Sequence, residues 1–568
     1  MKTKLLFKLG LIATLLFSTT IFAQWSSNSA INNSICTAPF LQYQQVAISD
    51  GSGGAIITWA DKRSGTGVGA EQEFTDIYAQ RINSAGVSQW LANGVPICTV
   101  AGRQHLPVII SDNNGGAIIT WSDERNSSTN LSDIFAQHIS SSGTILWALN
   151  GVSICSKVDD QNNVSTTSDG NGGAIITWED RRNGLDYNIF AQSINSSGVT
   201  QWNLDGTLVC NATNNQKNPE IIAAETGQAI ITWVDKRVST SSSQIYALKI
   251  NNGGVNAWGG TTTNGVLICA AVSCLEPKLV SDGNFGAIIT WYDRRNGVDY
   301  NIYAQKIIAD GTIPWLSLGG LGIEICTEVG NQVLPQICSD GANGAFIAWG
   351  DSRQGNTSSD VYFQHITNDS QFVIPWTING SSIVSVTGSQ NAPALIADGF
   401  GGAILSWNDY RNGSSADIYT QRVNATGFAL WDNTLTGVPV CTEASDQSFA
   451  TTIVQGNSGE AIIVWKDDRN GNSDIFAQKV NAQGTLANKT VAVENQFFTL
   501  YPNPTANANF SIQSLNSILD VTAYDILGKQ IAIEKNNDSY KINASTGIYT
   551  IKISDDNGNS QIKKLILN

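Results

Sequence analysis

The sequence predicts an all-β protein: an eight-bladed β-propeller of four-stranded blades that is closed by the N-terminal strand, followed by a small C-terminal β-sandwich. Three observations carry this prediction. One segment recurs eight times, each copy holds four short strand-like runs and no helix-like run, and the pattern stops shortly after Lys489. The expected domains are a leader at 1–23, a propeller at 24–490 and a β-sandwich at 491–568.

The leader has the composition of a cleavable secretory signal. Lys2, Lys4 and Lys8 precede an apolar run at 9–17, and small and polar residues follow up to Ala23. The run is too short to span a bilayer and no other stretch is long enough, so no transmembrane segment is expected. We therefore expect a secreted chain that begins at Gln24 after cleavage.

Charge argues against one class of partner. The chain has 47 acidic and 32 basic residues, a formal net charge of -15, and no block of like charge. Nucleic-acid binding needs a basic surface, so nucleic acid is not an expected partner.

The repeat is visible in four near-identical segments, GGAIITWSDERN, GGAIITWEDRRN, FGAIITWYDRRN and GGAILSWNDYRN. Their tryptophans belong to a series of eight, spaced 55 to 62 residues apart: Trp59, Trp121, Trp178, Trp233, Trp291, Trp349, Trp407 and Trp465. In repeat two the four runs are LPVIISD, GGAIITWSD, DIFAQHIS and TILWALNGVSIC, separated by turn-forming residues. Four short strands per repeat are typical of propeller blades.

A second set of tryptophans indicates how the ring closes. Repeats one to seven carry one in the fourth run, before an Ile-Cys-like ending: Trp90, Trp147, Trp202, Trp258, Trp315, Trp376 and Trp431. Repeat eight lacks both features, and the N-terminal fragment QWSSNSAINNSIC supplies them as Trp25 and Ile35-Cys36. The N-terminal residues are thus predicted to form the outer strand of the last blade, which removes an unpaired edge. A staggered open solenoid is the alternative.

Every repeat also contains a complete Trp-x-Asp-x-Arg signature where the second run ends. A feature present in all copies answers a need of the blade, such as an ion pair or a capped turn. The functional alternative is a ring of anion-binding arginines on the loop-rich face. Its candidates are Arg63, Arg125, Arg182, Arg237, Arg295, Arg353, Arg411 and Arg469.

Departures between copies are where a site for one ligand is expected. Repeat one has the longest insertion, SGTGVGAEQEFTD, which places Glu71 and Glu73 beside Asp76; all three are candidate binding residues. The same face is expected to carry a repeated loop glutamine, found as Gln42, Gln104, Gln161, Gln216, Gln332, Gln390 and Gln447.

Seven of the nine cysteines share one repeat position: Cys36, Cys98, Cys155, Cys210, Cys269, Cys326 and Cys441. Val384 fills it in repeat seven, which indicates a small buried apolar side chain. Cys274 replaces the loop glutamine of repeat five, and Cys338 lies on the first run of repeat six. Because an exported protein can form disulfides, Cys269–Cys274 and Cys326–Cys338 are candidate bridges.

Signatures of chemistry are few. His138 and His365 occupy a position that is Arg or Lys in other repeats and are expected to face solvent, while His105 is placed in a loop. None has zinc-ligand spacing, so no metal site, catalytic residue or cofactor is predicted. The turn at Asp169 to Gly172 suits calcium or a hairpin equally, and no run matches a calcium loop with its glutamate.

The hairpin DRRNGVDYNIYAQKI of repeat five resembles those of TolB-like propellers over about 15 residues, which favours the propeller interpretation. The sialidase Asp-box is not matched, because Asp169 and Trp178 are too far apart in sequence.

The tail contains YPNP, VTAYDILGKQI, TGIYTIKI and KKLILN in that order, and it resembles the type A sorting domain of type IX secretion. The resemblance implies a β-sandwich, export to the cell surface or medium of a Bacteroidota-type bacterium, and the type IX machinery as a partner. The matching positions are Tyr501, Pro502, Asn503, Pro504, Gly528, Lys529, Gly547, Tyr549, Lys563 and Lys564.

Together these features favour a secreted or surface-displayed, non-catalytic binding or adhesion scaffold for a carbohydrate, a surface protein or another surface macromolecule. Two alternatives stay open. The first is a polysaccharide-active hydrolase or lyase that uses carboxylates of the loop-rich face. The second is a structural surface-layer protein.

Overall fold

The computed structural model describes residues 25–64, 74–128, 130–259, 264–315, 322–355, 358–372, 378–413, 415–454, 459–486, 498–514, 517–525, 529–536, 539–555 and 560–568. These residues form strands and turns, and none of them belongs to a helix that could cross a bilayer. The chain divides into two compact units, Met1–Asn488 (unit 1) and Lys489–Asn568 (unit 2), which we describe separately.

In unit 1 each of the first seven repeats supplies four antiparallel strands that pair in the order of the sequence, whereas repeat eight supplies three strands and the N-terminal segment supplies the fourth. The first strands are β2 (Gln42–Ser49), β6 (Gln104–Ser111), β10 (Asp159–Ser168), β14 (Gln216–Ala223), β18 (Leu275–Ser281), β22 (Gln332–Ser339), β26 (Gln390–Ala397) and β30 (Gln447–Val454). The second strands are β3 (Ala55–Asp61), β7 (Ala117–Asp123), β11 (Ala174–Asp180), β15 (Ala229–Ser239), β19 (Ala287–Asp293), β23 (Ala345–Asp351), β27 (Ala403–Asp409) and β31 (Ala461–Asp467).

The third strands are β4 (Asp76–Ile82), β8 (Asn130–Ile139), β12 (Asn188–Ile194), β16 (Ser242–Ile250), β20 (Asn301–Ile307), β24 (Asp360–Ile366), β28 (Asp417–Val423) and β32 (Asp474–Val480). The fourth are β5 (Val95–Cys98), β9 (Val152–Cys155), β13 (Thr207–Cys210), β17 (Val266–Cys269), β21 (Ile323–Cys326), β25 (Ser381–Ser382), β29 (Val438–Cys441) and β1 (Asn33–Cys36). A short parallel pairing of β8 with β10 joins the sheets of repeats two and three.

The N-terminal strand completes the last sheet, as the sequence predicted. β1 pairs with β32, with Ser34 opposite Phe476. The indole nitrogen of Trp25 donates to the carbonyl of Ser84 in the first sheet at 3.0 Å, and Trp90 makes the same bond to Ser141 in the second sheet at 3.1 Å. The described contact between the last and first repeats is therefore of the same kind as that between neighbouring repeats.

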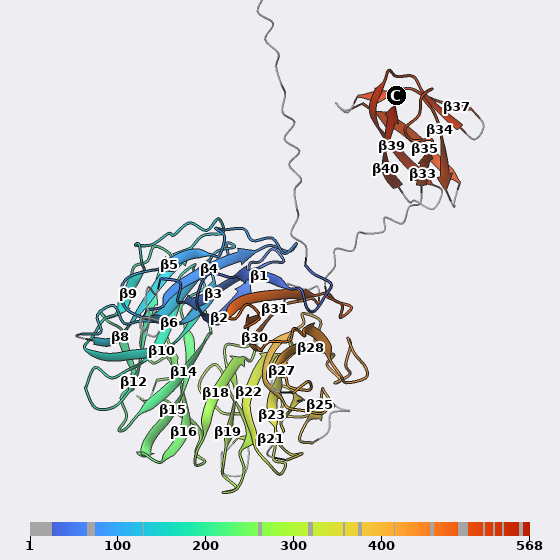
Figure 1. Ribbon diagram of the computed structural model, residues 1–568. Helices are drawn as coiled ribbons and strands as arrows, with labels where there is room; N and C mark the ends of the chain where they lie inside the picture. Colours follow the sequence, from blue (N-terminus) through green and yellow to red (C-terminus); the bar gives the residue numbers. More distant parts are fainter. Residues whose placement is uncertain are drawn as a thin grey trace, which may run out of the picture. The chain divides into compact units, whose positions relative to one another are not determined.

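The sheets stand side by side around a common centre, in the manner of a propeller (Figure 1). Each first strand contacts the first strand of the next repeat, and β30 contacts β2. The second strands are almost entirely buried, because they lie between first and third strands and are covered on both faces by the neighbouring sheets.

The apolar core is divided into clusters that each join two adjacent sheets. In one cluster Ile118 and Ala136 of repeat two pack against Ile176 and Trp178 of repeat three. The tryptophan ring needs a glycine beside it: Gly206 has φ +94°, and a Cβ there would lie 2.5 Å from the Trp178 ring. This explains why a glycine precedes the fourth strand of most repeats.

Unit 2 consists of two four-stranded sheets that share one apolar cluster, with Phe498 and Phe510 from one sheet and Ile551 and Leu565 from the other. The first sheet has the order β33 (Phe498–Tyr501), β34 (Asn509–Ser514), β38 (Ser539–Ile542), β37 (Ile533–Asn536). The second has the order β36 (Gln530–Ile531), β35 (Ile518–Tyr524), β39 (Gly547–Asp555), β40 (Ser560–Leu567).

The YPNP segment of unit 2 is bound to the last strand. The side-chain amide of Asn503 donates to the carbonyl of Lys564 at 2.6 Å, and its oxygen accepts from the amide of Ile566 at 2.9 Å. The hydroxyl of Tyr549 donates to the carbonyl of Ser545 at 2.8 Å. Gly528 lies outside the described residues.

Candidate functional site

The eight arginines predicted as candidate anion ligands are each bound to the aspartate of their own repeat. In repeat three the guanidinium of Arg182 donates to both carboxylate oxygens of Asp180, at 2.8 and 2.6 Å, and lies 3.8 Å from the centre of the Phe190 ring. The indole of Trp178 donates to the same carboxylate at 2.8 Å. Asp180 has no exposed surface.

All eight repeats share this arrangement, with ion-pair distances of 2.5 to 2.7 Å and ring distances of 3.4 to 4.2 Å. Bidentate arginine bonds and ring stacking fix the side chain in one orientation. The geometry favours a structural part for these arginines, and their participation in ligand binding stays a prediction.

The repeated cysteines belong to the same arrangement. In repeat one, the Arg63 guanidinium contacts the sulfur of Cys36 at 3.0 Å. Burial raises the pKa of the Cys36 thiol to about 12, so the thiol is protonated at neutral pH and is not a nucleophile.

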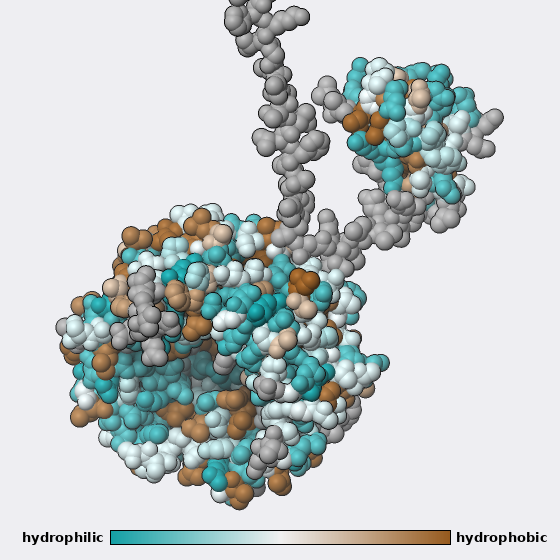
Figure 2. All heavy atoms as spheres, viewed as in Figure 1, coloured by the Kyte–Doolittle hydropathy of each residue, from teal (hydrophilic) through white to brown (hydrophobic). Residues whose placement is uncertain are grey.

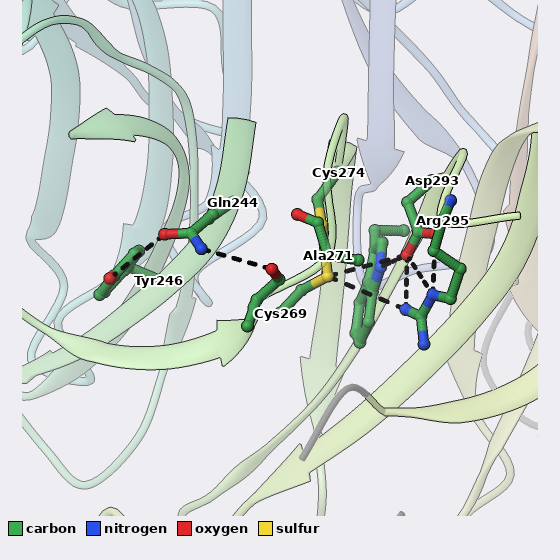
Figure 3. Close-up of a disulfide and its surroundings, with 9 residues drawn as sticks. Gln244, Tyr246, Cys269, Ala271, Cys274, Asp293 and Arg295 are labelled. Atoms are coloured by element: carbon green, nitrogen blue, oxygen red, sulfur yellow. Dashed lines mark hydrogen bonds and ion pairs between the residues drawn. A yellow bond between two sulfur atoms is a disulfide. The ribbon is translucent and has the colours of Figure 1, made fainter. Parts of the chain in front are cut away.

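Cys269 and Cys274 form a disulfide (Figure 3). Cys274 stands where other repeats have the loop glutamine, whose amide donates to carbonyls of the preceding loop, as Gln216 does to Asn214 at 2.8 Å. The disulfide therefore ties a loop that hydrogen bonds tie elsewhere.

The second candidate bridge, Cys326–Cys338, is not formed, and both residues are free thiols. Cys326 contacts the guanidinium of Arg353 at 3.1 Å and packs in the cluster between repeats five and six. Cys338 packs with Phe346 in the cluster between repeats six and seven. The two sulfurs thus lie on opposite sides of the sheet of repeat six.

The expected exposure of the histidines is wrong. His138 and His365 are 7% and 6% exposed, and their Nε2 atoms lie 3.0 and 2.9 Å from carboxylates of Asp112 and Asp340. Each histidine therefore contacts the aspartate that begins the turn between the first and second strands of its own repeat. His105 is part of β6 rather than a loop, and burial lowers its pKa to about 4.

Of the three candidate acids of repeat one, Glu71 and Glu73 lie outside the described residues. Asp76 begins β4 directly opposite Asp61 and is 3% exposed. Burial raises the pKa of the Asp76 carboxyl to about 6.

The first strands of repeats two to five carry different side chains, and these strands line a recess with a volume of about 310 Å³. We call it the recess; it is lined by Val108, Asn163, Val164, Ser165, Asn218, Pro219, Glu220, Glu276, Pro277 and Lys278. Figure 2 shows that the visible face of unit 1 is hollowed near its centre, with hydrophilic and hydrophobic residues mixed around the hollow.

A β-bulge builds the wall of the recess. The register of β10 shifts between Asn162 and Ser165, and the same shift recurs in β14 and β18. The residue two positions after the loop glutamine, or after Cys274 in repeat five, adopts a left-handed conformation. Its φ is 53° at Asn163, 53° at Asn218 and 46° at Glu276. A bulge redirects the side chains of the strand that carries it.

The bulge recurs from repeat to repeat, whereas the side chain at its left-handed position differs between repeats. The equivalent residues are Gln44, Leu106, Leu334 and Ala392 in repeats one, two, six and seven. Repeats three, four and five thus place two amides and a carboxylate side by side, which is the kind of departure expected for a site that serves one ligand.

Glu179 lies beneath this polar stretch. Its Oε1 accepts from the side-chain amide of Asn163 and the backbone amide of Asn218, both at 2.7 Å. Lys217 Nζ lies 3.8 Å from its Oε2. The side chain is 3% exposed, and burial raises its pKa above the ordinary glutamate value. Glu179 therefore links the sheets of repeats three and four.

Glu220 and Lys278 form an ion pair at the recess, and the Ser165 hydroxyl lies 3.4 Å from the second oxygen of Glu220. Burial and the Glu276 carboxylate raise the pKa of Tyr292 to about 12. Carboxylate, amide, hydroxyl and ammonium groups thus meet beside the apolar side chains that complete the lining.

The polar stretch continues outward on repeat three. The hydroxyl of Tyr187 donates to Asp160 at 2.6 Å, and Lys217 Nζ lies 4.0 Å from the centre of the Tyr187 ring. Burial and this hydrogen bond raise the pKa of Tyr187 to about 12.

The sequence analysis did not single out the recess. One signal could have found it: the residue between Trp and Asp of the signature is Glu179 in repeat three, but Ala60, Ser122, Val234, Tyr292, Gly350, Asn408 and Lys466 elsewhere. A buried-strand position that carries a carboxylate in one copy is a departure of the expected kind.

Comparison with known proteins decides the nature of the tail. Residues 499–568 match the family model of the secretion system C-terminal sorting domain. The sorting domain directs the protein to the extracellular space or the outer cell surface, with the type IX secretion machinery as its partner. No curated protein matches this chain.

Several solved structures resemble this chain weakly. The α-L-arabinanase of Penicillium chrysogenum, complexed with arabinobiose, is 14% identical with a TM-score of 0.36, over 57% of this chain and 94% of that one. An ulvan lyase of polysaccharide lyase family 25 is 9% identical with a TM-score of 0.41, over 83% and 99%. The family 93 α-L-arabinofuranosidase of Fusarium graminearum is 12% identical with a TM-score of 0.32, over 57% and 94%. Such scores carry no argument about the chemistry of this chain.

Proposed function

We propose that residues 24–490 form a closed eight-bladed β-propeller that acts, after export from a Bacteroidota-type bacterium, as a non-catalytic binding scaffold for carbohydrate. Residues 491–568 serve as its β-sandwich sorting domain. The observation that carries the proposal is the recess, where three neighbouring repeats depart from the common pattern and present polar side chains on rigid strands.

The groups of the recess suit a sugar. Asn163, Asn218 and Ser165 offer both donors and acceptors, which is what hydroxyl groups require, and Val108 and Pro219 offer apolar surface for the C–H groups of a sugar ring. The strands that hold them are packed between neighbouring sheets, so the side chains are pre-positioned.

The carboxylates of the recess support binding more than catalysis. Glu220 is engaged by Lys278, and Glu179 accepts two hydrogen bonds from amides. Each carboxylate therefore has fixed partners of its own.

A second candidate is a polysaccharide-active hydrolase or lyase, and one observation favours it. The raised pKa of Glu179 suits a general acid, and Glu220 is a second carboxylate of the same region.

Glycan-array binding followed by calorimetry on the full chain tests the proposal. Asn218→Ala and Glu220→Gln should each weaken binding about tenfold, the equivalent of about 1.4 kcal/mol. Glu225→Gln is the matched control, because Glu225 follows the same strand and also pairs with a lysine, Lys249, at 2.7 Å, but does not line the recess.

Equal loss of affinity in the control variant, or no glycan binding at all, would overturn the proposal. Release of shorter products from a bound glycan, abolished by Glu179→Gln, would establish the enzymatic candidate instead. Concentration-dependent assembly without glycan binding would favour a surface-layer component.

A further inference from the structure

We infer that the recess accepts an uncharged, hydroxyl-bearing sugar residue and rejects one that carries a carboxylate or sulfate group. This inference rests on the proposed function and adds the ligand class. It follows from the charges that surround the recess and from the partners that its lysine already has.

The balance of charge in the lining is negative. Glu220 and Glu276 both line the recess, whereas Lys278 is the single basic residue of the lining. Glu179 adds a third carboxyl group below, because it is bonded to Asn163 and Asn218 of the same wall. An anionic ligand would therefore meet like charge in a partly desolvated site.

Lys278 already offsets the charge of Glu220. Its ammonium group is in direct contact with the Glu220 carboxylate, and the Lys278 side chain is 38% exposed. A ligand carboxylate that reached the ammonium would share this one cation with Glu220. The gain from the new ion pair would therefore be opposed by repulsion between the two carboxylates.

The second lysine nearby is also engaged. Lys217 Nζ lies between the Glu179 carboxylate, 3.8 Å away, and the face of the Tyr187 ring, 4.0 Å from its centre. These contacts direct the ammonium toward the protein. Both lysines are thus already paired with a carboxylate of the protein.

An uncharged sugar meets none of these obstacles. Its hydroxyls can donate to the Glu220 and Glu276 carboxylates without breaking the ion pair, and can accept from the side-chain amide of Asn218. Carboxylate acceptors form stronger bonds to hydroxyls than neutral acceptors do, which favours hydroxyl-rich residues in this setting.

The experiment compares matched ligands on the full chain. A panel of neutral polysaccharides (β-glucan, xylan, galactomannan and arabinan) is used together with an anionic derivative of each: C6-oxidised β-glucan and galactomannan, and sulfated xylan and arabinan. The backbone is thus kept while charge is added. Isothermal titration at physiological ionic strength should show at least tenfold tighter binding of one neutral polymer than of its charged derivative.

Equal or tighter binding of the charged form would overturn the inference while leaving carbohydrate binding in place. If no polymer binds in either form, the proposed function itself fails. The two failures are therefore distinguishable.

A variant locates the selectivity. Glu276→Gln removes one of the two carboxylates that line the recess. It should raise affinity for the charged polymer about tenfold and lower affinity for the neutral polymer, whose hydroxyls lose a charged acceptor, so that the ratio of the two affinities falls. Glu225→Gln, outside the recess, should change neither affinity. Unchanged selectivity in Glu276→Gln would overturn the assignment to the recess, since Glu276 is half-buried on the bulge of β18 and the substitution is nearly isosteric.

Discussion

At the scale of single residues, a second buried aspartate, Asp76, stands opposite the signature aspartate of repeat one, and burial raises its pKa. Burial also raises the pKa of the equivalent aspartates of other repeats: Asp133, Asp360, Asp417 and Asp474. Asp61 and Asp76 face each other across two strands, and the arginine of the repeat binds Asp61. In repeats three and five the equivalent of Asp76 is an asparagine, Asn188 or Asn301. The neutral side chain at this position shows that the charge is not needed for the fold.

Asp76→Asn should therefore stabilise unit 1 at neutral pH. The pKa of Asp76 is raised to about 6 from 3.8, so between these two values the folded protein holds a proton that the unfolded chain has released, and above them the folded protein carries a buried charge. Stability contributed by this group is present below pH 4 and is lost as pH rises to about 6, at a cost of roughly 3 kcal/mol. Thermal unfolding from pH 4 to 7.5 should show a flatter pH dependence for the variant. A steeper dependence, or a lower midpoint at pH 7, would contradict this account.

The role of a residue could be predicted from the sequence where all repeats carry the same residue type. It was harder to predict where the role depends on whether the side chain is buried. The Asp–Arg pairs follow from a signature that is complete in eight copies. His138 and His365 were placed wrongly in solvent because a basic side chain on a strand end usually reaches water. The partners that bury them, Asp112 and Asp340, lie on another strand end and are not adjacent in sequence.

At the scale of strands, β1 is the element on which the last sheet depends. Removal of residues 25–36 would expose the outer edge of β32 and uncover the apolar cluster that holds Trp25, Ile35 and Cys36. We expect a lower unfolding temperature and self-association through the free edge.

Calorimetry and light scattering after gel filtration measure both effects. A synthetic peptide of residues 24–37 added in trans should restore the monomer and raise the unfolding temperature. Ser27→Ala, a change at an exposed position of the same segment, is the control and should behave as wild type. A truncated protein that stays monomeric and equally stable would show that β1 is dispensable.

The position of β1 could be predicted because the tryptophan and cysteine missing from repeat eight reappear at the N-terminus. The bulges of the first strands could not be predicted from the sequence. Left-handed positions are normally marked by glycine, but Asn163, Leu106 and Ala392 occupy them in this chain. The recess depends on those bulges, and so the sequence alone did not locate it.

At the scale of the whole molecule, the division into two units predicts separate unfolding. Truncation after Asn488 should leave the calorimetric transition of unit 1 within about 2 °C of its position in the full chain and abolish export. Asn503→Ala, which removes the bonds between the YPNP segment and β40, should lower the transition of unit 2 alone. A shift in the unit 1 transition in either variant would contradict the independence of the units.

The pairing of β1 with β32 also has a consequence for the order of events during synthesis. The bond between Asn32 and Arg469 spans 437 positions in the sequence, whereas the other sheets of unit 1 pair strands of one repeat or, for β8 and β10, of two consecutive repeats. A nascent chain can thus assemble seven sheets in succession as each repeat emerges, while the eighth waits until its two distant halves meet. The slowest step in folding of unit 1 should therefore be the docking of its first segment, long after that segment has been made.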